Sequence, residues 1–455
     1  MCGIAGLIEK KAARFPTEVL EQMSLKIAHR GPDGSGLKVY AEENLGLAHR
    51  RLAIIDLSAA AAQPMLLDDR YCMVFNGEIY NYLEIRNLLI EKGLVFTTNS
   101  DAEVLLQAYH FWGTTCLEQL DGMWAFCIFD RLKQTLFCAR DPFGVKPFYY
   151  VNTPEHFGFA SEIKSLLCIP SYKAAVNPKA VADFLANAQI EVESEGFFKG
   201  VFELPPGHHM SYSFKDQDFK IAPYKRNQET TYTDTQEALN EAVKRRLRAD
   251  VPIGFCLSGG LDSSTLLAIS KDIQNKESVE SLSNGITAFT AVHDSPLDER
   301  SWAQKMVDQT KVDWIQQEVN AKGLIESFEK IIYHQDIPLL TSSTYAQSAV
   351  MQAAAQQNIK ILLDGQGGDE LFAGYQVFYP TFLKELLLKG KFIKFIKEWR
   401  HLDNSPTHKK YILKEWSQDV LSMLPPSFVR GLFSRKKIAL QYLTDFEIPK
   451  RKRYS

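Results

Sequence analysis

The chain reads Ser258-Gly259-Gly260-Leu261-Asp262-Ser263-Ser264 directly after an apolar run at 251–257 and directly before a helical pattern. The apolar run, the Gly-Gly turn and the helical pattern predict a strand, a loop and a helix N-terminus, in that order. Backbone N–H groups at a helix N-terminus lack partners within the helix and attract negative charge. The loop has no lysine, which argues against the G-x-x-x-x-G-K-[ST] loop of kinases and GTPases. We therefore expect an anion-binding loop of another kind; a Gly-rich turn without a ligand is the alternative.

Helix and strand patterns alternate around this loop from residue 236 onward. Strands are predicted at 286–292, 312–319 and 359–364, and helices at 299–309, 324–334 and 345–357. Such alternation is typical of a parallel sheet with helices on both faces, which binds ligands at the carboxyl ends of its strands. A second glycine-rich loop, Asp364-Gly365-Gln366-Gly367-Gly368-Asp369-Glu370, should lie at the same edge. A plain turn followed by a helix cap is the alternative.

The composition is that of a multidomain protein that acts on small molecules. The 455 residues predict two or three domains, and the formal net charge of -3 gives no reason to expect nucleic acid or an anionic membrane as a partner. The seven cysteines form no C-x-x-C pair, so a disulfide framework and a zinc ribbon are not expected. No apolar run is long enough to span a membrane, and the N-terminus lacks the pattern of a signal peptide. We therefore expect a cytoplasmic protein.

The second residue, Cys2, is a candidate nucleophile. If the initiator methionine is removed, Cys2 carries both a thiol and a free α-amine, whose ordinary pKa values are about 8.5 and about 8. The amine could then accept the thiol proton, so nucleophile and base would share one residue. A small buried residue at the start of a strand is the alternative.

Three further segments carry polar residues with a possible catalytic use. An arginine in the stretch 49–56 could hold a carboxylate through two hydrogen bonds. Asn76-Gly77 interrupts an apolar run, which predicts either a hairpin or a pair of donors for an oxyanion. Asp101 precedes a helical pattern and could either cap the helix or bind an ammonium group.

The first half of the chain predicts antiparallel sheets. Its strands, for example 123–130 and 135–139, are short, apolar and separated by turn residues, which is typical of sandwiched sheets flanked by helices. A turn is predicted at 204–209, where His208 and His209 suggest a surface turn more than a metal site. The predicted domains are 2–205 and 236–455, with a polar linker at 206–235.

Ordered motifs along this half resemble the glutaminase domain of class II glutamine amidotransferases, which are N-terminal-nucleophile hydrolases. The motifs are MCGIAG at 1–6, HRGPD at 29–33, RLAIID at 51–56, FNGEIYN at 75–81, SDAE at 100–103, LDGMWAF at 120–126 and RDPFGVKPFYY at 140–150. The resemblance implies that Cys2 is the nucleophile and that Asn76 and Gly77 stabilise the oxyanion. It further implies a glutamine site made of Arg51, Leu52, Ile54, Asn76, Gly77, Glu78 and Asp101, with Arg51 on the glutamine carboxylate.

The loop at 258–264 resembles the pyrophosphate loop of ATP pyrophosphatases, and the two halves together resemble the glutamine-hydrolysing asparagine synthetases to about residue 380. The resemblance implies ATP contacts from Leu257, Ser258, Gly259, Gly260, Asp262, Ser263, Ser264, Val292, Asp364 and Gly365. It implies Mg²⁺ on Asp262 and Asp369. The implied reaction converts aspartate, ATP and glutamine to asparagine, AMP, pyrophosphate and glutamate through aspartyl-AMP. The implied partners are these small molecules, and a homodimer is possible.

Two departures from the family leave alternatives open. Gln366 stands in the catalytic loop where many members have a glutamate, and an amide cannot act as an acid or base, so the acceptor could be another carboxylate. The family usually continues beyond residue 455 to a late lysine that balances the pyrophosphate charge, so we expect slow adenylation unless Lys450, Arg451 or another basic residue replaces it. A glutaminase that serves a regulatory role is the second alternative. The segment 392–400 predicts a basic amphipathic helix, and 450–453 a short basic end.

Overall fold

The structure is a computed structural model and describes residues 1–11, 15–190, 195–225, 232, 234–296, 298–375, 377–402, 409 and 411–416. The chain divides into two compact units, Met1–Asp364 and Gly365–Ser455. The basic segment 450–453 lies outside the described residues.

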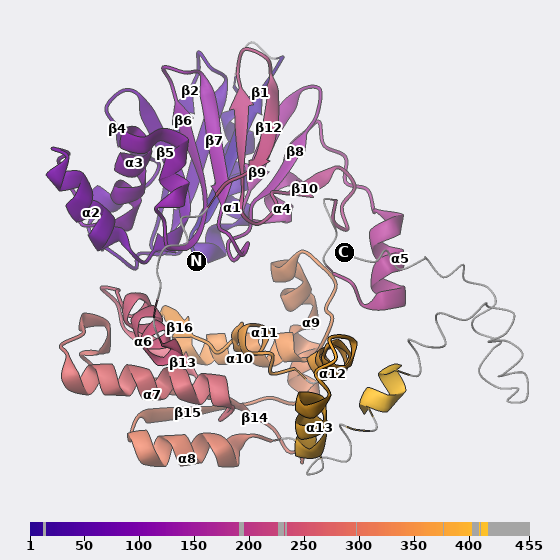
Figure 1. Ribbon diagram of the computed structural model, residues 1–455. Helices are drawn as coiled ribbons and strands as arrows, with labels where there is room; N and C mark the ends of the chain where they lie inside the picture. The colour runs from indigo at the N-terminus through magenta and orange to yellow at the C-terminus, as the bar shows by residue number, and fades with distance from the viewer. Residues whose placement is uncertain are drawn as a thin grey trace, which may run out of the picture. The chain divides into compact units, whose positions relative to one another are not determined.

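The first half of the larger unit contains two antiparallel sheets of six strands each (Figure 1). One has the order β10-β8-β9-β1-β3-β2, with bounds Val201–Glu203, Tyr149–Asn152, His156–Ala160, Gly3–Glu9, Leu45–Arg51 and Gly34–Tyr40. The other has the order β12-β11-β7-β6-β5-β4, with bounds Asp218–Pro223, His208–Ser213, Thr135–Arg140, Gly122–Asp130, Tyr71–Ile79 and Met65–Leu67. The predicted strands at 123–130 and 135–139 are thus β6 and β7.

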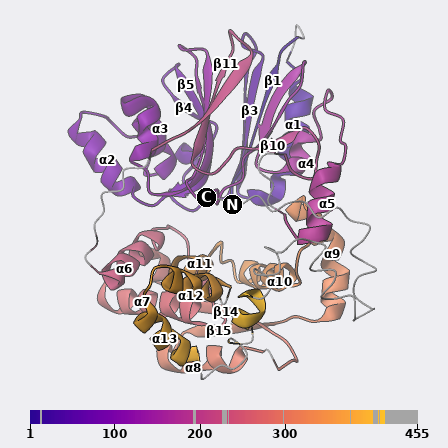
Figure 2. The ribbon, with the colours of Figure 1, turned by 45° about the vertical axis from the view of Figure 1, so that its right-hand side comes forward.

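Apolar faces hold these sheets together as a sandwich with helices on its outside. Residues from β1 and β3 pack between the sheets against residues from β5, β6 and β7, among them Leu47, Val74 and Phe129, all 0% exposed. Figure 2 shows α2 (Tyr82–Glu91) and α3 (Asp101–Trp112) on one side, and α1 (Thr17–Lys26) and α4 (Ile163–Leu166) on the other. The predicted sandwich with flanking helices is therefore confirmed. One further helix, α5, spans Pro178–Asn187.

The rest of the larger unit is built on a parallel sheet with the order β15-β14-β13-β16. The strands are β13 (Ile253–Cys256), β14 (Thr287–Val292), β15 (Asp313–Glu318) and β16 (Ile361–Leu363). The helices are α6 (Thr235–Arg246), α7 (Leu261–Lys276), α8 (Arg300–Thr310), α9 (Ala321–Gln335) and α10 (Ser343–Gln356). Residues of α6, α7 and α8 pack on one side of the sheet, and α10 packs on the other. The predicted parallel sheet is confirmed.

The smaller unit is described to residue 416 and is helical. Its helices are α11 (Gly368–Phe372), α12 (Phe378–Leu388) and α13 (Phe392–His401). Leu383, Leu386, Leu402 and Ile412 form its buried apolar cluster. The amphipathic helix predicted at 392–400 is α13. No helix among the described residues of the chain is long and apolar enough to cross a membrane.

Two segments differ from the sequence-based expectation. The predicted linker, 206–235, contains β11 and β12, which extend the second sheet through antiparallel pairing with β7. The alternation in β11 explains this, because Met210 and Tyr212 are 0% exposed while Ser211 and Ser213 are partly exposed. His208 and His209 accordingly begin a strand instead of lying in a turn. Asn76-Gly77 forms no hairpin, because β5 continues through both residues, paired with Ala125 and Trp124.

Candidate active site

One cavity collects most of the residues predicted to bind glutamine. It has a volume of about 30 Å³ and lies where the start of β1, the end of β3, the middle of β5 and the N-terminus of α3 meet. Its lining consists of Cys2, Arg51, Leu52, Ala53, Ile54, Ile55, Ala61, Gln63, Phe75, Gly77, Glu78, Ser100, Asp101 and Ala102. Every residue of the predicted glutamine site except Asn76 therefore lines this cavity.

Cys2 lies against the loop that follows β3. Its sulfur is 3.4 Å from the backbone nitrogen of Leu52 and 3.6 Å from the Leu52 carbonyl oxygen. Burial raises the pKa of the Cys2 thiol, while the Leu52 backbone hydrogen bond acts in the opposite direction. The structure retains Met1, whose α-amine has a pKa lowered to about 5, chiefly by burial. That amine belongs to Met1, and the α-nitrogen of Cys2 is a peptide nitrogen as long as Met1 is present.

Arg51 is the last residue of β3, and its guanidinium turns back on the following loop. Its Nη1 donates to the Ser58 carbonyl oxygen at 2.7 Å, and its Nη2 donates to the Asp56 carbonyl oxygen at 2.5 Å. The side chain is partly exposed, so the guanidinium has further donors for a ligand. A carboxylate in the cavity could accept hydrogen bonds from it.

Asn76 lies beside the cavity on β5. Its side chain is 0% exposed, and neither Oδ1 nor Nδ2 has a hydrogen-bond partner among the described residues. An unpaired buried polar group costs about 1–3 kcal/mol, so an amide in this state is suited to a ligand that satisfies it. The neighbouring Gly77 lies so close to β6 that an added Cβ would be 2.2 Å from the Met123 carbonyl oxygen. A side chain at 77 would therefore displace the strand that holds Asn76.

Two carboxyl groups line the cavity, that of Asp101, which is buried, and that of Glu78, which is partly exposed. Burial raises the pKa of Asp101 to about 6, against the effect of the backbone N–H groups that it accepts, including that of Ile79 at 2.9 Å. Burial and the charge of Asp101 together raise the pKa of Glu78 well above its usual range. Both shifts show that negative charge here lacks compensation. An ammonium group between the two carboxyls would supply it.

The predicted pyrophosphate loop joins β13 to α7. The Ser258 backbone N–H donates to the Ser263 hydroxyl at 3.3 Å, and the Gly260 N–H donates to the Ser258 hydroxyl at 3.1 Å. Gly259 has a φ of +85°, and an added Cβ would lie 2.4 Å from the backbone nitrogen of Ala303 in α8. The loop therefore needs glycine for both conformation and space. Asp262 and Ser264 lie in the first turn of α7.

The remaining predicted ATP residues of the larger unit lie at the same edge of the parallel sheet. Leu257 directly follows β13 and Val292 ends β14, but their side chains are 1% and 5% exposed and belong to the core. Asp364 directly follows β16, where Gln347 Nε2 donates to its Oδ2 at 3.3 Å. Contact of a nucleotide with Leu257 or Val292 would therefore need a shift of buried side chains or use the backbone.

The predicted residues of the second loop from Gly365 onward belong to the smaller unit. Gly365 is partly exposed, and Gln366 is an exposed turn residue. Asp369 lies in the first turn of α11, with Oδ1 so close to Gly374 that an added Cβ there would be 1.8 Å away. Gln366 therefore lies open to solvent, while Asp369 is packed against its own loop.

The two predicted metal ligands lie in different units of the chain. Asp262 is in the first turn of α7 in the larger unit, and Asp369 is in the first turn of α11 in the smaller unit. A carboxylate is a ligand that Mg²⁺ commonly uses together with substrate phosphates. Among the described residues, no group of three or more His, Cys, Asp or Glu residues is placed to hold a metal ion.

Several residues near Cys2 were given no role from the sequence. Arg30 Nε donates to the Cys2 carbonyl oxygen at 2.8 Å, and Arg30 Nη1 donates to Glu162 Oε1 at 2.9 Å. Lys146 is 5% exposed, and burial lowers its pKa to about 8, although the charges of Glu78 and Cys2 act against this. Arg30 belongs to the motif HRGPD, and Lys146 belongs to the motif RDPFGVKPFYY. The motifs could have pointed to both residues, but their contacts could not be predicted from the sequence.

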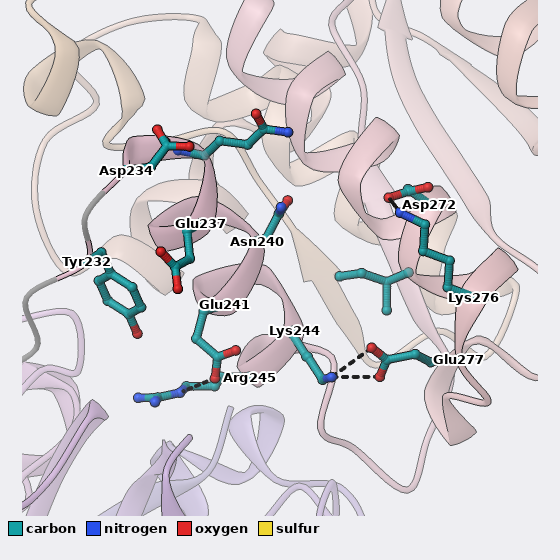
Figure 3. A pocket seen from close by; sticks show the side chains of 12 residues that line it. Tyr232, Asp234, Glu237, Asn240, Glu241, Lys244, Arg245, Asp272, Lys276 and Glu277 are labelled. Carbon is teal, nitrogen blue, oxygen red and sulfur yellow. Dashed lines mark hydrogen bonds and ion pairs between the residues drawn. The ribbon is translucent and has the colours of Figure 1, made fainter.

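A larger cavity lies away from all these residues. It has a volume of about 690 Å³ and is lined by α6, α7 and the segment before α6 (Figure 3). Six of its charged side chains form three pairs: Lys244 with Glu277 at 2.7 Å, Lys276 with Asp272 at 2.6 Å, and Arg245 with Glu241 at 3.0 Å. None of the predicted glutamine or ATP residues lines it. It is an open polar groove and not the catalytic cavity.

Comparison with known proteins agrees with the two halves of the fold. Residues 1–225 match the family model of the glutamine amidotransferase domain, and residues 234–437 match that of asparagine synthase. The putative glutamine-hydrolysing asparagine synthetase 2 of Methanocaldococcus jannaschii is 32% identical over 428 residues, which cover 87% of this chain and 80% of that protein. The chain belongs to the glutamine-hydrolysing asparagine synthetase family.

Members and relatives of this family differ in length and in name. Glutamine-hydrolysing asparagine synthetase 3 of Bacillus subtilis is 31% identical over 402 residues, which cover 84% of this chain and 64% of that protein. Amidase chyE of Penicillium rubens is 30% identical over 416 residues, which cover 85% of this chain and 61% of that protein. The chain thus spans less than two thirds of these two relatives.

Proposed function

We propose that this protein is a glutamine-dependent amide synthetase. Cys2 hydrolyses glutamine to glutamate and ammonia, ATP activates the carboxylate of aspartate as aspartyl-AMP with release of pyrophosphate, and ammonia displaces AMP to give asparagine. The observation that carries the proposal is the single cavity that joins Cys2 to Arg51, Glu78 and Asp101.

The cavity offers a complement for each polar part of glutamine. Arg51 is placed for the α-carboxylate, and the two uncompensated carboxyls are placed for the α-ammonium group. The unpaired Asn76 amide is suited to the oxyanion that forms when the thiolate attacks the side-chain amide. These features together support thiol-based hydrolysis of glutamine over hydrolysis of an amide that lacks an α-carboxylate and an α-ammonium group.

The chain's own contribution to ATP chemistry is the edge of the parallel sheet. The backbone N–H groups at the start of α7 would bind phosphate oxygens, and Gly259 permits their close approach. On the family resemblance alone, we propose Asp262 and Asp369 as ligands of Mg²⁺, which neutralises phosphate charge when bound. This support is independent of the glutamine cavity, because it rests on different residues in a different sheet.

The carboxylate that receives the ammonia could differ from aspartate. Relatives include proteins named amidases, and Gln366 replaces an ionisable residue with an amide. We therefore propose, as the second candidate, the same chemistry on another carboxylate. The reaction steps are unchanged and the product alone differs.

A product assay tests both candidates. The full chain is incubated with glutamine, Mg-ATP and aspartate, and asparagine, glutamate, AMP and pyrophosphate are measured. Equal amounts of all four products support asparagine synthesis. Pyrophosphate release that requires a different carboxylate from an acceptor panel supports the second candidate. Glutamate release without any acceptor-dependent release of pyrophosphate contradicts both candidates. The remaining alternative is then a glutaminase that serves a regulatory role.

A further inference from the structure

The wall of the glutamine cavity includes a loop that is bonded directly to the parallel-sheet half of the same unit. We define the glutamine loop as residues 52–56, between the end of β3 and the short helical turn at Ala59–Ala61. Leu52 contacts the Cys2 sulfur, and Ile54 packs against the apolar core of the parallel sheet. One short segment thus touches both the nucleophile and the other half.

Asp250 holds the far end of the glutamine loop with two hydrogen bonds. Its backbone N–H donates to the Ile54 carbonyl oxygen at 3.0 Å, and its carboxylate Oδ2 accepts the Asp56 N–H at 2.7 Å. The carboxylate of Asp56 in turn accepts the Asn99 N–H at 2.7 Å, which precedes α3. The position of Asp250 therefore determines the position of the loop.

Lys360 holds the near end through Asp33. Its Nζ lies 2.7 Å from Asp33 Oδ2, and the same oxygen accepts the Ala53 N–H at 2.8 Å. The Lys360 and Asp33 side chains are 32% and 28% exposed, so the pair is partly shielded from water. A movement of Lys360 would therefore displace Asp33 and, through it, Ala53, which is next to Leu52 at the Cys2 sulfur.

Both holding residues enter neighbouring strands whose other ends carry the predicted ATP loops. Asp250 precedes β13, which leads to Ser258, and Lys360 precedes β16, which leads to Asp364. The two strands pair in parallel, with Ile253 opposite Ile361. The path from Asp250 to Ser258 is eight residues and that from Lys360 to Asp364 is four, which in extended backbone correspond to roughly 25 Å and roughly 13 Å. The glutamine loop and the ATP edge thus lie at opposite ends of two paired strands.

The cavity is narrow, with a volume of about 30 Å³. Of its walls, β5 is paired on both sides, with β6 and β4, whereas residues 52–55 belong to no strand or helix. The glutamine loop is therefore the wall held outside a sheet, and Asp250 and Lys360 are among the groups that hold it.

We propose that Asp250 and Lys360 are positioning residues through which occupancy of the ATP edge changes the affinity of the cavity for glutamine. The inference rests on the proposed function. Because coupling of two binding equilibria is reciprocal, glutamine changes the affinity for ATP by the same factor. Couplings of this kind commonly amount to a factor of about 5 to 150.

The test measures glutamine binding to the full chain in a Cys2→Ala background, where glutamine is not consumed. The glutamine Kd is determined by calorimetry without and with saturating Mg-ATP, in the parent and in Lys360→Met and Asp250→Ala. Lys276→Met is the matched control, since Lys276 makes an exposed ion pair with Asp272 on α7. Lys360→Arg tests rescue by a retained charge.

We expect Mg-ATP to change the parent Kd by about tenfold and to change it by less than twofold in both variants. The control and Lys360→Arg should keep most of the parent effect. Other bonds between the same two halves, such as Arg248 to Glu84 at 2.7 Å and Lys164 to Asp336 at 3.0 Å, remain in every variant. If Asp250 and Lys360 had only a structural role, their substitution would lower the melting temperature or change the glutamine Kd equally without and with Mg-ATP. The ratio of the two Kd values would then stay the same.

Two outcomes would overturn the inference: a parent Kd that is the same with and without Mg-ATP, or variants that retain the parent ratio. If Lys360→Met does not fold, the ratio in Asp250→Ala and Lys360→Gln decides. Failure of the proposed function is recognised separately, as absence of acceptor-dependent pyrophosphate release from the chain with Cys2 intact and ammonia supplied. The Kd ratio does not depend on that result.

Discussion

The Cys2 sulfur and the backbone nitrogen of Leu52 lie 3.4 Å apart, so the nucleophile and the glutamine loop are in direct contact. Burial raises the thiol pKa, and the thiol therefore needs a nearby base before it can attack. The α-amine of Cys2 is that base in the proposed mechanism. It becomes available when Met1 is removed, which predicts a mature protein lighter by one methionine residue.

The first prediction is that Cys2→Ala abolishes glutamine hydrolysis and leaves ammonia-dependent amide synthesis intact. The reason is that no ATP residue belongs to the cavity around Cys2. Glutamate release and ammonia-dependent pyrophosphate release are measured separately. Cys168→Ala is the control, because Cys168 is a partly exposed cysteine outside the cavity. Glutamate formation above background in the Cys2 variant would show that another group is the nucleophile.

Arg51→Ala should raise the KM for glutamine by roughly thirtyfold, because loss of a charged contact to a carboxylate costs about 2 kcal/mol. The variant also loses the hydrogen bonds from Arg51 to the Asp56 and Ser58 carbonyls. Arg51→Lys keeps the charge without the fork and should fall between the two. The neighbouring Arg50, which donates to the Ser24 hydroxyl at 2.9 Å outside the cavity, supplies the control Arg50→Ala. Equal effects at 50 and 51 would refute the assignment.

Glutamine binding should tighten as the pH rises through about 6. Burial raises the Asp101 pKa to about 6 in the empty cavity, so below that pH the carboxyl is protonated and has no charge for an ammonium group. The KM for glutamine is measured from pH 5 to pH 8, with Glu91→Gln on the surface of α2 as the control. Asp101→Asn should bind weakly and with little change over this range. A KM that rises with pH in the parent would contradict the role of Asp101.

The fold was predictable wherever the apolar pattern is regular. The runs before Ser258 and at 286–292 predicted the parallel strands because both faces of those strands are buried. A search for apolar runs does not find β11 and β12, because polar residues interrupt both strands. The segment 206–235 was therefore predicted to be a linker. Met210 and Tyr212 held the missing information, since they alternate at the period of a strand.

The site was predictable from motifs but its supports were not. Motif positions predicted the residues that line the cavity, because those positions are defined by local sequence. Asp250 bonds to a residue 194 positions away and Lys360 to one 327 positions away, and no local pattern specifies such pairs. The unpaired state of Asn76 likewise depends on what packs around it and appears only in the folded chain.

A buried ion-pair cluster beneath Cys2 predicts a specific pH dependence of stability. Burial would raise the Glu162 pKa, but hydrogen bonds from His29 and Lys164 and the charge of Arg30 outweigh it and lower the pKa to about 2. A carboxyl held at about 2 instead of its usual 4.5 contributes about 3 kcal/mol of folding free energy at pH 7. This stability is present above pH 4.5 and is lost as the pH falls toward 2.

Glu162→Gln should therefore lose stability at pH 7, and its difference from the parent should shrink below pH 4.5. Unfolding is followed at a series of pH values down to the lowest at which the parent is folded. Glu155→Gln is the control, because Glu155 makes an exposed pair with Lys11 at 3.4 Å. A difference that stays constant over this pH range would show that the charge of Glu162 contributes nothing.

The last prediction separates the two activities at the pyrophosphate loop. Gly259 has a φ of +85°, and a Cβ there would lie 2.4 Å from the Ala303 nitrogen and 2.6 Å from Trp302. Gly259→Ala must therefore push the loop away from α8 or break its conformation, which displaces the N–H groups at the start of α7. Acceptor-dependent pyrophosphate release should fall by at least about a hundredfold, the usual cost of losing an aligned donor, while glutamine hydrolysis persists.

Gly285→Ala is the matched control for Gly259→Ala. Gly285 also has a positive φ, +93°, but nothing lies within 4 Å of an added Cβ. Both variants carry the same backbone strain, so a difference between them reports the collision of the loop with α8 and not the cost of a left-handed alanine. Pyrophosphate release and glutamate release are measured for both, together with the Kd for Mg-ATP. If the two variants lose pyrophosphate release equally, the packing of Gly259 against Ala303 is not what shapes the ATP loop.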